Sequence, residues 1–367
     1  MDGLADLTIV IPTYGRPDYV RRQVDFWTGS PARIVIADGS PSPLSFAPKS
    51  VSTNITYIHS DGDFHSRMLR LADEVSTKFV AVLGDDDFFS PDGLRACINR
   101  LGADPTLIGC VGRSIRFFFQ DGRVLAEQRD PESAEFPSSV KSGLDRLYAT
   151  YHPGKIGALL YGVYRTEPWS DVVRSAYSAR FKTGYIYDTV IRVLLTYRGP
   201  VGVEEVAMWF CSAENPPVRD APGMNRNVGF VEWLSSDATK DEVSDCIRLM
   251  VDDLVDLGQD EPHEIRSAVE FVVGELRNRY QKKAAIRARP GVRARRFVFA
   301  KSPRFLKRFG KRFMPTGLRR VLDWTMVPIA ELVTKVEASG IRISSNDVEK
   351  IVDAVVGKAQ RVANHES

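Results

Sequence analysis

Cysteine and long apolar runs are both scarce in this chain of 367 residues. The four cysteines lie far apart and form no CxxC pair or Cys/His cluster, so we expect neither a structural zinc site nor a disulfide scaffold. No stretch offers the roughly 18 consecutive apolar residues that a membrane-spanning helix needs. The first residues lack the basic start and the small-residue cleavage site of a secretory signal. These absences predict a cytoplasmic protein in a reducing compartment.

Acidic residues are missing from one long segment, residues 277–320, which carries seventeen Lys and Arg. Removing these seventeen from the 50 basic residues of the chain leaves 33 against 47 acidic residues, a net charge of −14 for the remainder. Such segregation of charge predicts an anionic partner for residues 277–320.

Within that segment, "SPRFLKRFGKRFMP" has the pattern of a short helix with Pro303 at its first position. Its aromatic residues share one face and its basic residues fill the opposite face, which is typical of a helix that lies on a membrane surface. The aromatic face would alternatively pack on the body of the protein. Nucleic acid is not an expected partner, because no base-stacking or groove-reading element accompanies the charge.

Strand-like and helix-like segments alternate in the first half of the chain. The apolar runs "LTIVIPT", "RIVIAD", "NITYIHS" and "KFVAVLG" are separated by amphipathic stretches of helical period. This alternation predicts βαβ crossovers and a mostly parallel sheet. Polar clusters follow each run, namely "PTYGR", "ADGS", "SDGD" and "GDDD", and ligands of such sheets bind at the carboxyl ends of the strands. We therefore expect the four clusters to form one polar rim.

The last cluster, in "KFVAVLGDDDFFSPDGL", places Asp85, Asp86 and Asp87 at the mouth of a buried strand. Adjacent carboxylates repel one another, and more strongly at the edge of an apolar core, so the arrangement is costly unless a cation or an array of donors faces it. The plainer alternative is an acidic cap on the following helix. Asp92, just after Pro91, is the better candidate for that cap.

Taken together, "TIVIPTYGRPDYV", "RIVIADGS" and "FVAVLGDDDFFSPDGL" resemble the nucleotide-sugar-binding half of the glycosyltransferase family 2 proteins, which have the GT-A fold. The resemblance is good over residues 7 to about 102 and patchy to about 215. It implies an α/β fold with a Rossmann-like, mostly parallel sheet flanked by helices, followed by an all-helical C-terminal region. The expected domains are residues 1–223 for the GT-A part, 224–300 for a helical region, and 301–367 for a basic helical tail that associates with membrane or oligomerises.

The resemblance also implies a metal-dependent reaction. A nucleotide-sugar donor, with a UDP-sugar favoured, would be anchored by Mn²⁺ or Mg²⁺ bridging its diphosphate. Asp85 and Asp87 would be the DxD pair that holds the metal, whereas Asp86 would either take the second position or bind the ribose. The residues that would contact the donor are Pro12, Thr13, Tyr14, Arg16, Asp38, Ser40, Asp61, Arg67, Asp85 and Asp86.

Two features depart from the family pattern. The usual pair of acidic residues before Gly-Ser is Ala37-Asp38 here, which leaves Asp38 alone in that role. Many GT-A enzymes complete the metal shell with a late histidine, but this chain has none between His152 and His263.

An inverting transfer needs a general base that removes the proton of the acceptor hydroxyl. In the family this carboxylate comes from the start of a helix in the second half, which matches Asp188 in "GYIYDTVIRVLL". Asp188 is alternatively the N-cap of that helix. Glu204, Glu205 and Glu214 are the other candidates for the base.

The sequence as a whole predicts a glycosyltransferase, peripheral on the inner face of the cell membrane, that builds a polysaccharide or a lipid-linked glycan. Its final helix, residues 345 to 363, would pack on the body or on a second subunit. The sequence therefore leaves open whether the protein forms a homo-oligomer. Two alternatives remain. A sugar nucleotidyltransferase would need a Gly-rich loop after the first strand, but "PTYGRPDY" at that place has only one glycine. A non-catalytic sugar-nucleotide-binding protein would not need the acidic triplet.

Overall fold

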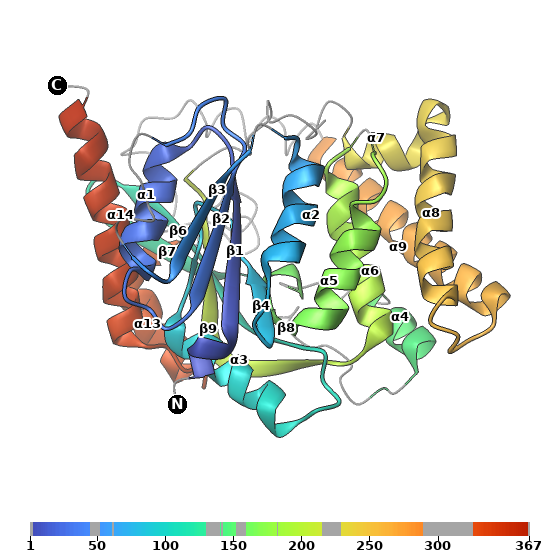
Figure 1. The fold of residues 1–367 in the computed structure, drawn as a ribbon, viewed down its shortest axis with the longest axis horizontal. Coiled ribbons are helices and arrows are strands. Elements are labelled where there is room, and N and C mark those ends of the chain that lie inside the picture. The colour runs from blue at the N-terminus through green and yellow to red at the C-terminus, as the bar shows by residue number, and fades with distance from the viewer. Residues whose placement is uncertain are drawn as a thin grey trace.

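The structure is a computed structural model that describes residues 3–44, 52–60, 62–129, 140, 142–151, 159–181, 183–214, 229–288 and 326–365. One twisted sheet runs through the molecule, and helices cover both of its faces (Figure 1). The predicted α/β class with a helix-flanked sheet and a helical C-terminal region is confirmed.

The first four strands form the parallel part of the sheet, in the spatial order β4, β1, β2, β3. Their bounds are β1 (Leu7–Thr13), β2 (Arg33–Asp38), β3 (Ile55–His59) and β4 (Phe79–Val82). Thr13 is level with Asp38, and Asp38 with His59. Val10 is level with Val82, so the chain after β4 reaches the same edge three residues later. The predicted rim therefore exists at the carboxyl ends of these strands.

The remaining strands make the sheet mixed, where the pattern of alternation predicted a mostly parallel one. They are β5 (Phe88–Phe89), β6 (Gly109–Gln120), β7 (Arg123–Arg129), β8 (Val163–Arg165), β9 (Val201–Ser212) and β10 (Val327–Pro328). β8 is antiparallel to both β4 and β6, and β6 runs parallel to β9. Asp121 and Gly122 both have positive φ, as a two-residue hairpin requires, and this turn reverses the chain between β6 and β7.

Each face of the sheet has its own core, because side chains alternate along a strand. Ile9 and Ile11 point into one core with α1, α3, α13 and α14, whereas Val10 points into the other with the remaining long helices. The helices of the first core are α1 (Pro17–Trp27), α3 (Pro91–Ala103), α13 (Ile329–Ala338) and α14 (Ser345–His365). Those of the second are α2 (Phe64–Glu74), α4 (Gly143–Tyr151), α5 (Thr166–Ala176), α6 (Tyr185–Arg198), α7 (Phe230–Ser235), α8 (Lys240–Val255) and α9 (Pro262–Ala288).

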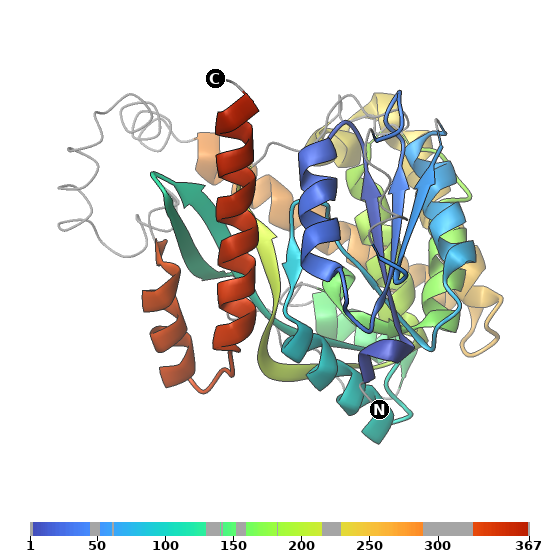
Figure 2. The same cartoon turned by 60° about the vertical axis from the view of Figure 1, so that its left-hand side comes forward.

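The C-terminal segment returns to the N-terminal half of the chain. β10 pairs with β7, α13 packs beside β7, and α14 lies against α1 (Figure 2). Arg342 exchanges backbone hydrogen bonds of 2.8 Å with Glu205 and Ala207 of β9. The final helix thus packs on the body, and the short strand β10 is a departure from the all-helical pattern expected after residue 224. No helix in the described ranges is both long and apolar enough to span a bilayer. The amphipathic helix predicted within residues 302–313 lies outside the described residues.

α3 begins with a cap built from two distant parts of the chain. Ser90 is the N-cap, and its side chain accepts a hydrogen bond from Gly93 N. The buried carboxylate of Asp347 in α14 accepts hydrogen bonds from Ser90 Oγ and from Asp92 N at 3.0 Å. The expectation that Asp92 caps this helix is wrong, because its carboxylate turns outward to Arg95 at 2.7 Å.

Replacing Asp347 with Ala should destabilise the fold, because the backbone N–H of Asp92 and the hydroxyl of Ser90 would lose their acceptor. We expect the free energy of unfolding to fall by about 1–3 kcal/mol, measured by urea denaturation. Asp353→Ala, an exposed substitution in the same helix, is the matched control and should stay within about 0.5 kcal/mol of the parent. Equal stability of the two variants would contradict the structural role of this cap.

Candidate functional site

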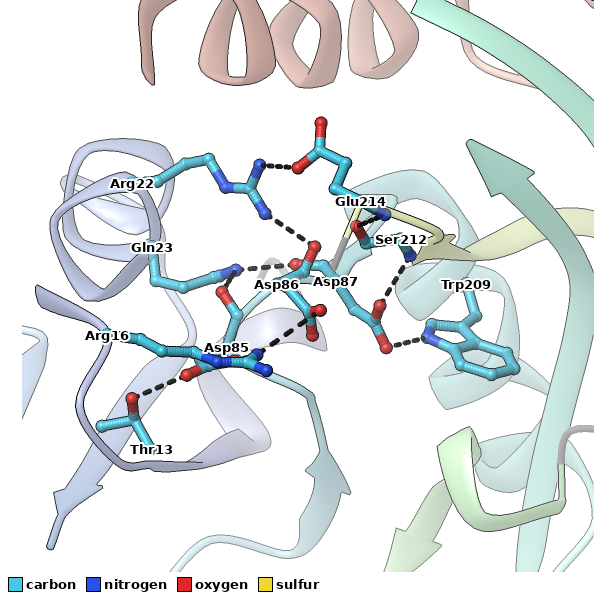
Figure 3. A network of polar contacts seen from close by, with 10 residues as sticks. All are labelled: Thr13, Arg16, Arg22, Gln23, Asp85, Asp86, Asp87, Trp209, Ser212 and Glu214. Atoms are coloured by element: carbon cyan, nitrogen blue, oxygen red, sulfur yellow. Dashed lines mark hydrogen bonds and ion pairs between the residues drawn. The ribbon is translucent and has the colours of Figure 1, made fainter. Parts of the chain in front are cut away.

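The polar rim is centred on the turn of residues 84–87, which follows β4. Asp87 N donates to Gly84 O at 3.1 Å and closes the turn. The three carboxylates of the acidic triplet, Asp85, Asp86 and Asp87, leave this turn in different directions (Figure 3). The alternative that they cap the next helix is excluded, because Ser90 is the N-cap of that helix.

Asp85 points back toward the end of β1. Thr13 Oγ1 donates to its Oδ2 at 2.7 Å, and Arg16 Nη1 donates to its Oδ1 at 2.8 Å. Burial raises the pKa of Asp85, whereas the charge of Arg16 and the hydrogen bond of Thr13 lower it. The same Arg16 nitrogen lies 3.5 Å from Asp86 Oδ2, so this guanidinium bridges the first two aspartates.

Asp87 points the other way, toward the end of β9. Its Oδ2 accepts from Trp209 Nε1 at 3.0 Å and its Oδ1 from Ser212 N at 2.8 Å. Burial and, next, the neighbouring charge of Asp86 raise the pKa of Asp87 to about 7, against the two hydrogen bonds, which lower it. A buried carboxylate with a raised pKa gains from a nearby cation, because the cation stabilises its charged form.

Asp86 and Asp87 each bring a carboxylate oxygen close to Gly84. The point at which a Cβ on Gly84 would stand lies 3.1 Å from Asp87 Oδ2 and 3.3 Å from Asp86 Oδ1. Carboxylate oxygens are the donors that Mg²⁺ and Mn²⁺ prefer. Asp85 lies close to Asp86 as well, since Arg16 Nη1 is 2.8 Å from Asp85 Oδ1 and 3.5 Å from Asp86 Oδ2. Within the described ranges, no group of three His, Cys, Asp or Glu side chains is arranged to hold a metal ion.

The end of β2 supports the turn that follows β1. Asp38 accepts from Ser40 N at 2.9 Å and from the Tyr57 hydroxyl at 2.7 Å, and Ser40 Oγ accepts from Gly15 N at 2.8 Å. Burial raises the pKa of Tyr57 to about 12. His59 Nε2 lies 2.8 Å from Ser40 O, so this histidine has a structural contact at the end of β3. Asp38 and Ser40 thus shape the rim beside β1.

Arg67 is a buried cation beneath the same rim. Its Nη1 donates to Thr13 O at 2.9 Å, while its Nε is buried and has no hydrogen-bond partner among the described residues. The guanidinium lies 5.7 Å from the Tyr14 ring centroid and so close to Gly39 that a Cβ there would stand 1.5 Å from Nη1. Burial lowers the pKa of Arg67, and the charge of Asp38 partly restores it.

Pro12 and Asp61 are the remaining predicted donor residues. Pro12 lies in β1 opposite Ala37, one residue before the rim. Asp61 lies outside the described residues.

Asp188 lies in the first turn of α6 rather than at its N-cap, which is Gly184, so the capping alternative is wrong. Its side chain is 53% exposed and its Oδ2 lies 4.0 Å from Arg192 Nη2. Burial raises the pKa of the Tyr161 phenol, and the charges of Asp87 and Asp188 raise it further. Both carboxylates are therefore within electrostatic reach of one phenol, whose ring stacks on Trp209 at 3.8 Å between centroids.

The three other candidates for the base are engaged elsewhere. Glu204 and Glu205 lie in the first half of β9, about 20 Å along the strand from Ser212. Arg113 pairs with Glu205, and Arg342 approaches Glu204 at 3.5 Å. Glu214 is close to the acidic triplet, but it is paired with Arg22 at 3.3 Å.

Sequence reasoning missed two groups of site residues. Trp209 and Ser212 meet Asp87 only because β9 pairs with β5 and β6, and no local pattern marks them. Arg22 and Gln23 in α1 bond the backbone of the acidic triplet. A signal existed for Gln23, since its spacing from Val20 and Trp27 places it on the apolar face of a helix, where an amide needs a buried partner.

Comparison with known proteins bears on this site. The model of the family described as glycosyl transferase family 2 matches residues 8–158. Among solved structures, that of residues 1–349 of TarS from S. aureus is similar with a TM-score of 0.44 at 12% identity, over 72% of this chain and 70% of that chain. Its complex with UDP-GlcNAc has a TM-score of 0.43 at 12% identity, over 70% and 69%. No curated protein matches the sequence.

The segment matched by the family model contains β1, β2 and β4 and all three residues of the acidic triplet. The resemblance seen in the sequence motifs is thereby confirmed over the part of the chain that builds the rim. Residues 8–158 thus match glycosyl transferase family 2, and this match identifies the chain as a glycosyltransferase.

Proposed function

We propose that this enzyme moves a sugar from a nucleoside-diphosphate donor to a hydroxyl group of a polysaccharide or a lipid-linked glycan. The observation that carries the proposal is that Arg16, which bonds Asp85, and Arg67, which bonds the backbone of Thr13, lie at the same sheet edge as the acidic triplet. Two cations and a carboxylate pair beside them are the groups that recognise a diphosphate together with a metal ion. Asp38 and Ser40, on the neighbouring strand, lie on the side where the nucleoside would bind.

In this proposal Asp86 and Asp87 would hold a divalent cation, Mn²⁺ or Mg²⁺, which would neutralise the charge that develops on the departing diphosphate. Asp85 keeps Arg16 in place beside the donor through its bond of 2.8 Å. The role of Asp86, open between metal and ribose in the sequence, is thus assigned to the metal, and Asp85 takes the position beside the donor.

The acceptor side is proposed to lie toward α6. Asp188 is solvent-exposed at the start of that helix, and a general base must meet an acceptor that arrives from solution. An acceptor hydroxyl deprotonated by Asp188 would attack the sugar carbon opposite the diphosphate, which inverts the configuration. Glu204 and Glu205, two other candidates for the base, lie in the first half of β9, too far from its end at Ser212 for this role.

Attachment to an anionic membrane surface is proposed for residues 277–320, at the inner face of the cell membrane. Each Lys or Arg near such a surface contributes about 1 kcal/mol, so a fraction of the seventeen suffices for reversible binding. In the described part of this segment, Arg277 and Lys282 are exposed on α9. An acceptor carried on a lipid would be met at that surface.

Nucleoside diphosphates should stabilise the protein in a Mn²⁺-dependent way. We expect a thermal-shift screen of UDP, GDP and dTDP to give one clear responder, with UDP favoured, because binding at 100 times Kd adds about 2.7 kcal/mol of stability. The matching monophosphate should respond less, and Asp86→Asn should lose the Mn²⁺ dependence while keeping the parent melting temperature. If no diphosphate shifts the transition with Mn²⁺ present, the donor site proposed here is wrong.

Asp188→Asn should slow sugar transfer by about 10²–10⁴-fold, the usual contribution of a general base, without weakening donor binding. Transfer is measured with the donor found in the screen, and donor binding by thermal shift. Asp171→Asn, on the exposed side of α5, is the control and should transfer at the parent rate. If Asp188→Asn transfers sugar at the parent rate, Asp188 is not the general base.

Replacing the six Lys and Arg between residues 301 and 312 with Gln should abolish binding to vesicles that contain anionic lipid. Co-sedimentation with phosphatidylglycerol vesicles measures this, with phosphatidylcholine vesicles as the neutral control. Truncation after residue 276 is a poor test, since it would also remove β10, α13 and α14, which pack on the body. Unchanged sedimentation of the Gln variant would refute the membrane role.

A further inference from the structure

Two consecutive residues of α1, Arg22 and Gln23, are polar yet completely buried, each with 0% of its surface exposed. Burying a guanidinium and an amide is costly unless their donors find acceptors. Most helices that cover a sheet turn such residues to solvent. Their position inside the molecule therefore requires partners, and the partners lie in the acidic triplet.

Arg22 and Gln23 together bond three successive backbone carbonyls. Gln23 Nε2 donates to Asp85 O at 3.0 Å and to Asp87 O at 2.6 Å, and Arg22 Nη2 donates to Asp86 O at 2.6 Å. These carbonyls belong to a turn outside helix and strand, so no regular pairing would satisfy them. Figure 3 shows both side chains reaching this backbone from the same helix.

Both donors are themselves held in one orientation. Trp27 Nε1 donates to Gln23 Oε1 at 3.1 Å, which directs the amide NH₂ toward the carbonyls. The Arg22 guanidinium lies between the rings of Tyr19 and Phe88, 4.7 Å from each centroid. Its Nη1 bonds Glu214 Oε2 at 3.3 Å, which links α1 to the chain just after β9. The pair thus has little freedom to follow a displaced turn.

Fixing all three carbonyls determines how the three side chains leave the turn. With the backbone held from the α1 side, Asp85 bonds Arg16, and Asp86 and Asp87 each place a carboxylate oxygen near Gly84. Arg22 and Gln23 make the bonds described above to the backbone of these residues and not to their carboxylates. Their effect on a bound cation would be exerted only through the residues that they hold.

We propose that Arg22 and Gln23 are positioning residues that set the geometry of the acidic triplet for a divalent cation. The inference rests on the proposed role of Asp86 and Asp87 as its ligands. Groups that orient metal ligands without touching the metal typically change metal affinity by 10–100-fold when they are removed.

The test measures Mn²⁺ affinity by quenching of tryptophan fluorescence, since the Trp209 indole lies 3.0 Å from Asp87 Oδ2. Gln23→Met and Arg22→Met keep the side-chain length but remove the donors, and we expect Mn²⁺ to bind 10–100-fold more weakly to both. Arg22→Lys keeps one charged donor and should lose less than Arg22→Met. Asp25→Asn, exposed on the same helix, is the control and should bind as the parent does.

Circular dichroism and melting curves separate positioning from loss of fold. Variants that are folded at the assay temperature and bind Mn²⁺ more weakly, with partial rescue by Lys at position 22, support the proposal. Folded Met variants with parent affinity overturn it. If the Met variants do not fold, Arg22→Lys against Asp25→Asn decides alone, and equal affinity of these two overturns the proposal. Failure of the parent protein itself to bind Mn²⁺ saturably would instead overturn the metal site, which distinguishes the two failures.

Discussion

The repulsion among three adjacent carboxylates at the end of a buried strand is the constraint on which this site depends. The protein relieves it with donors: Arg16 bonds Asp85 and lies 3.5 Å from Asp86, and Asp87 receives two N–H donors from β9. Relief is incomplete, because burial still holds the pKa of Asp87 at about 7. The cation of the proposed function would offset the charge that remains.

The mixed sheet is what brings the donors to the triplet. In a purely parallel sheet, a crossover helix would have to separate the triplet from the next strand along the chain. Here β5 follows the triplet directly and pairs with β9 in antiparallel orientation. The pairing of Phe88 with Phe210 places Trp209 and Ser212 on either side of Asp87. The second half of the chain therefore completes the site that the first half begins, and the site and the fold are stabilised by the same contacts.

The C-terminal segment has a comparable double role. Asp347 caps α3, the helix that follows the acidic turn, and α14 packs against α1, which holds that turn from the other side. The acidic turn is thus supported by α1 directly and by α14 through α1 and α3. Loss of this segment would loosen both supports of the triplet.

Local pattern in the sequence determined the alternation of strands and helices, the hairpin at Asp121-Gly122 and the rim on which the triplet lies, because periodicity and turn chemistry act between near neighbours. Tertiary structure alone decided which partner each aspartate meets. Ser212 is 125 residues from Asp87, and Asp347 is 257 residues from Ser90. Such contacts depend on strand register and helix packing, which no short segment encodes. The acidic motif thus predicted a cation site, and packing decided which neighbours each of its three carboxylates meets.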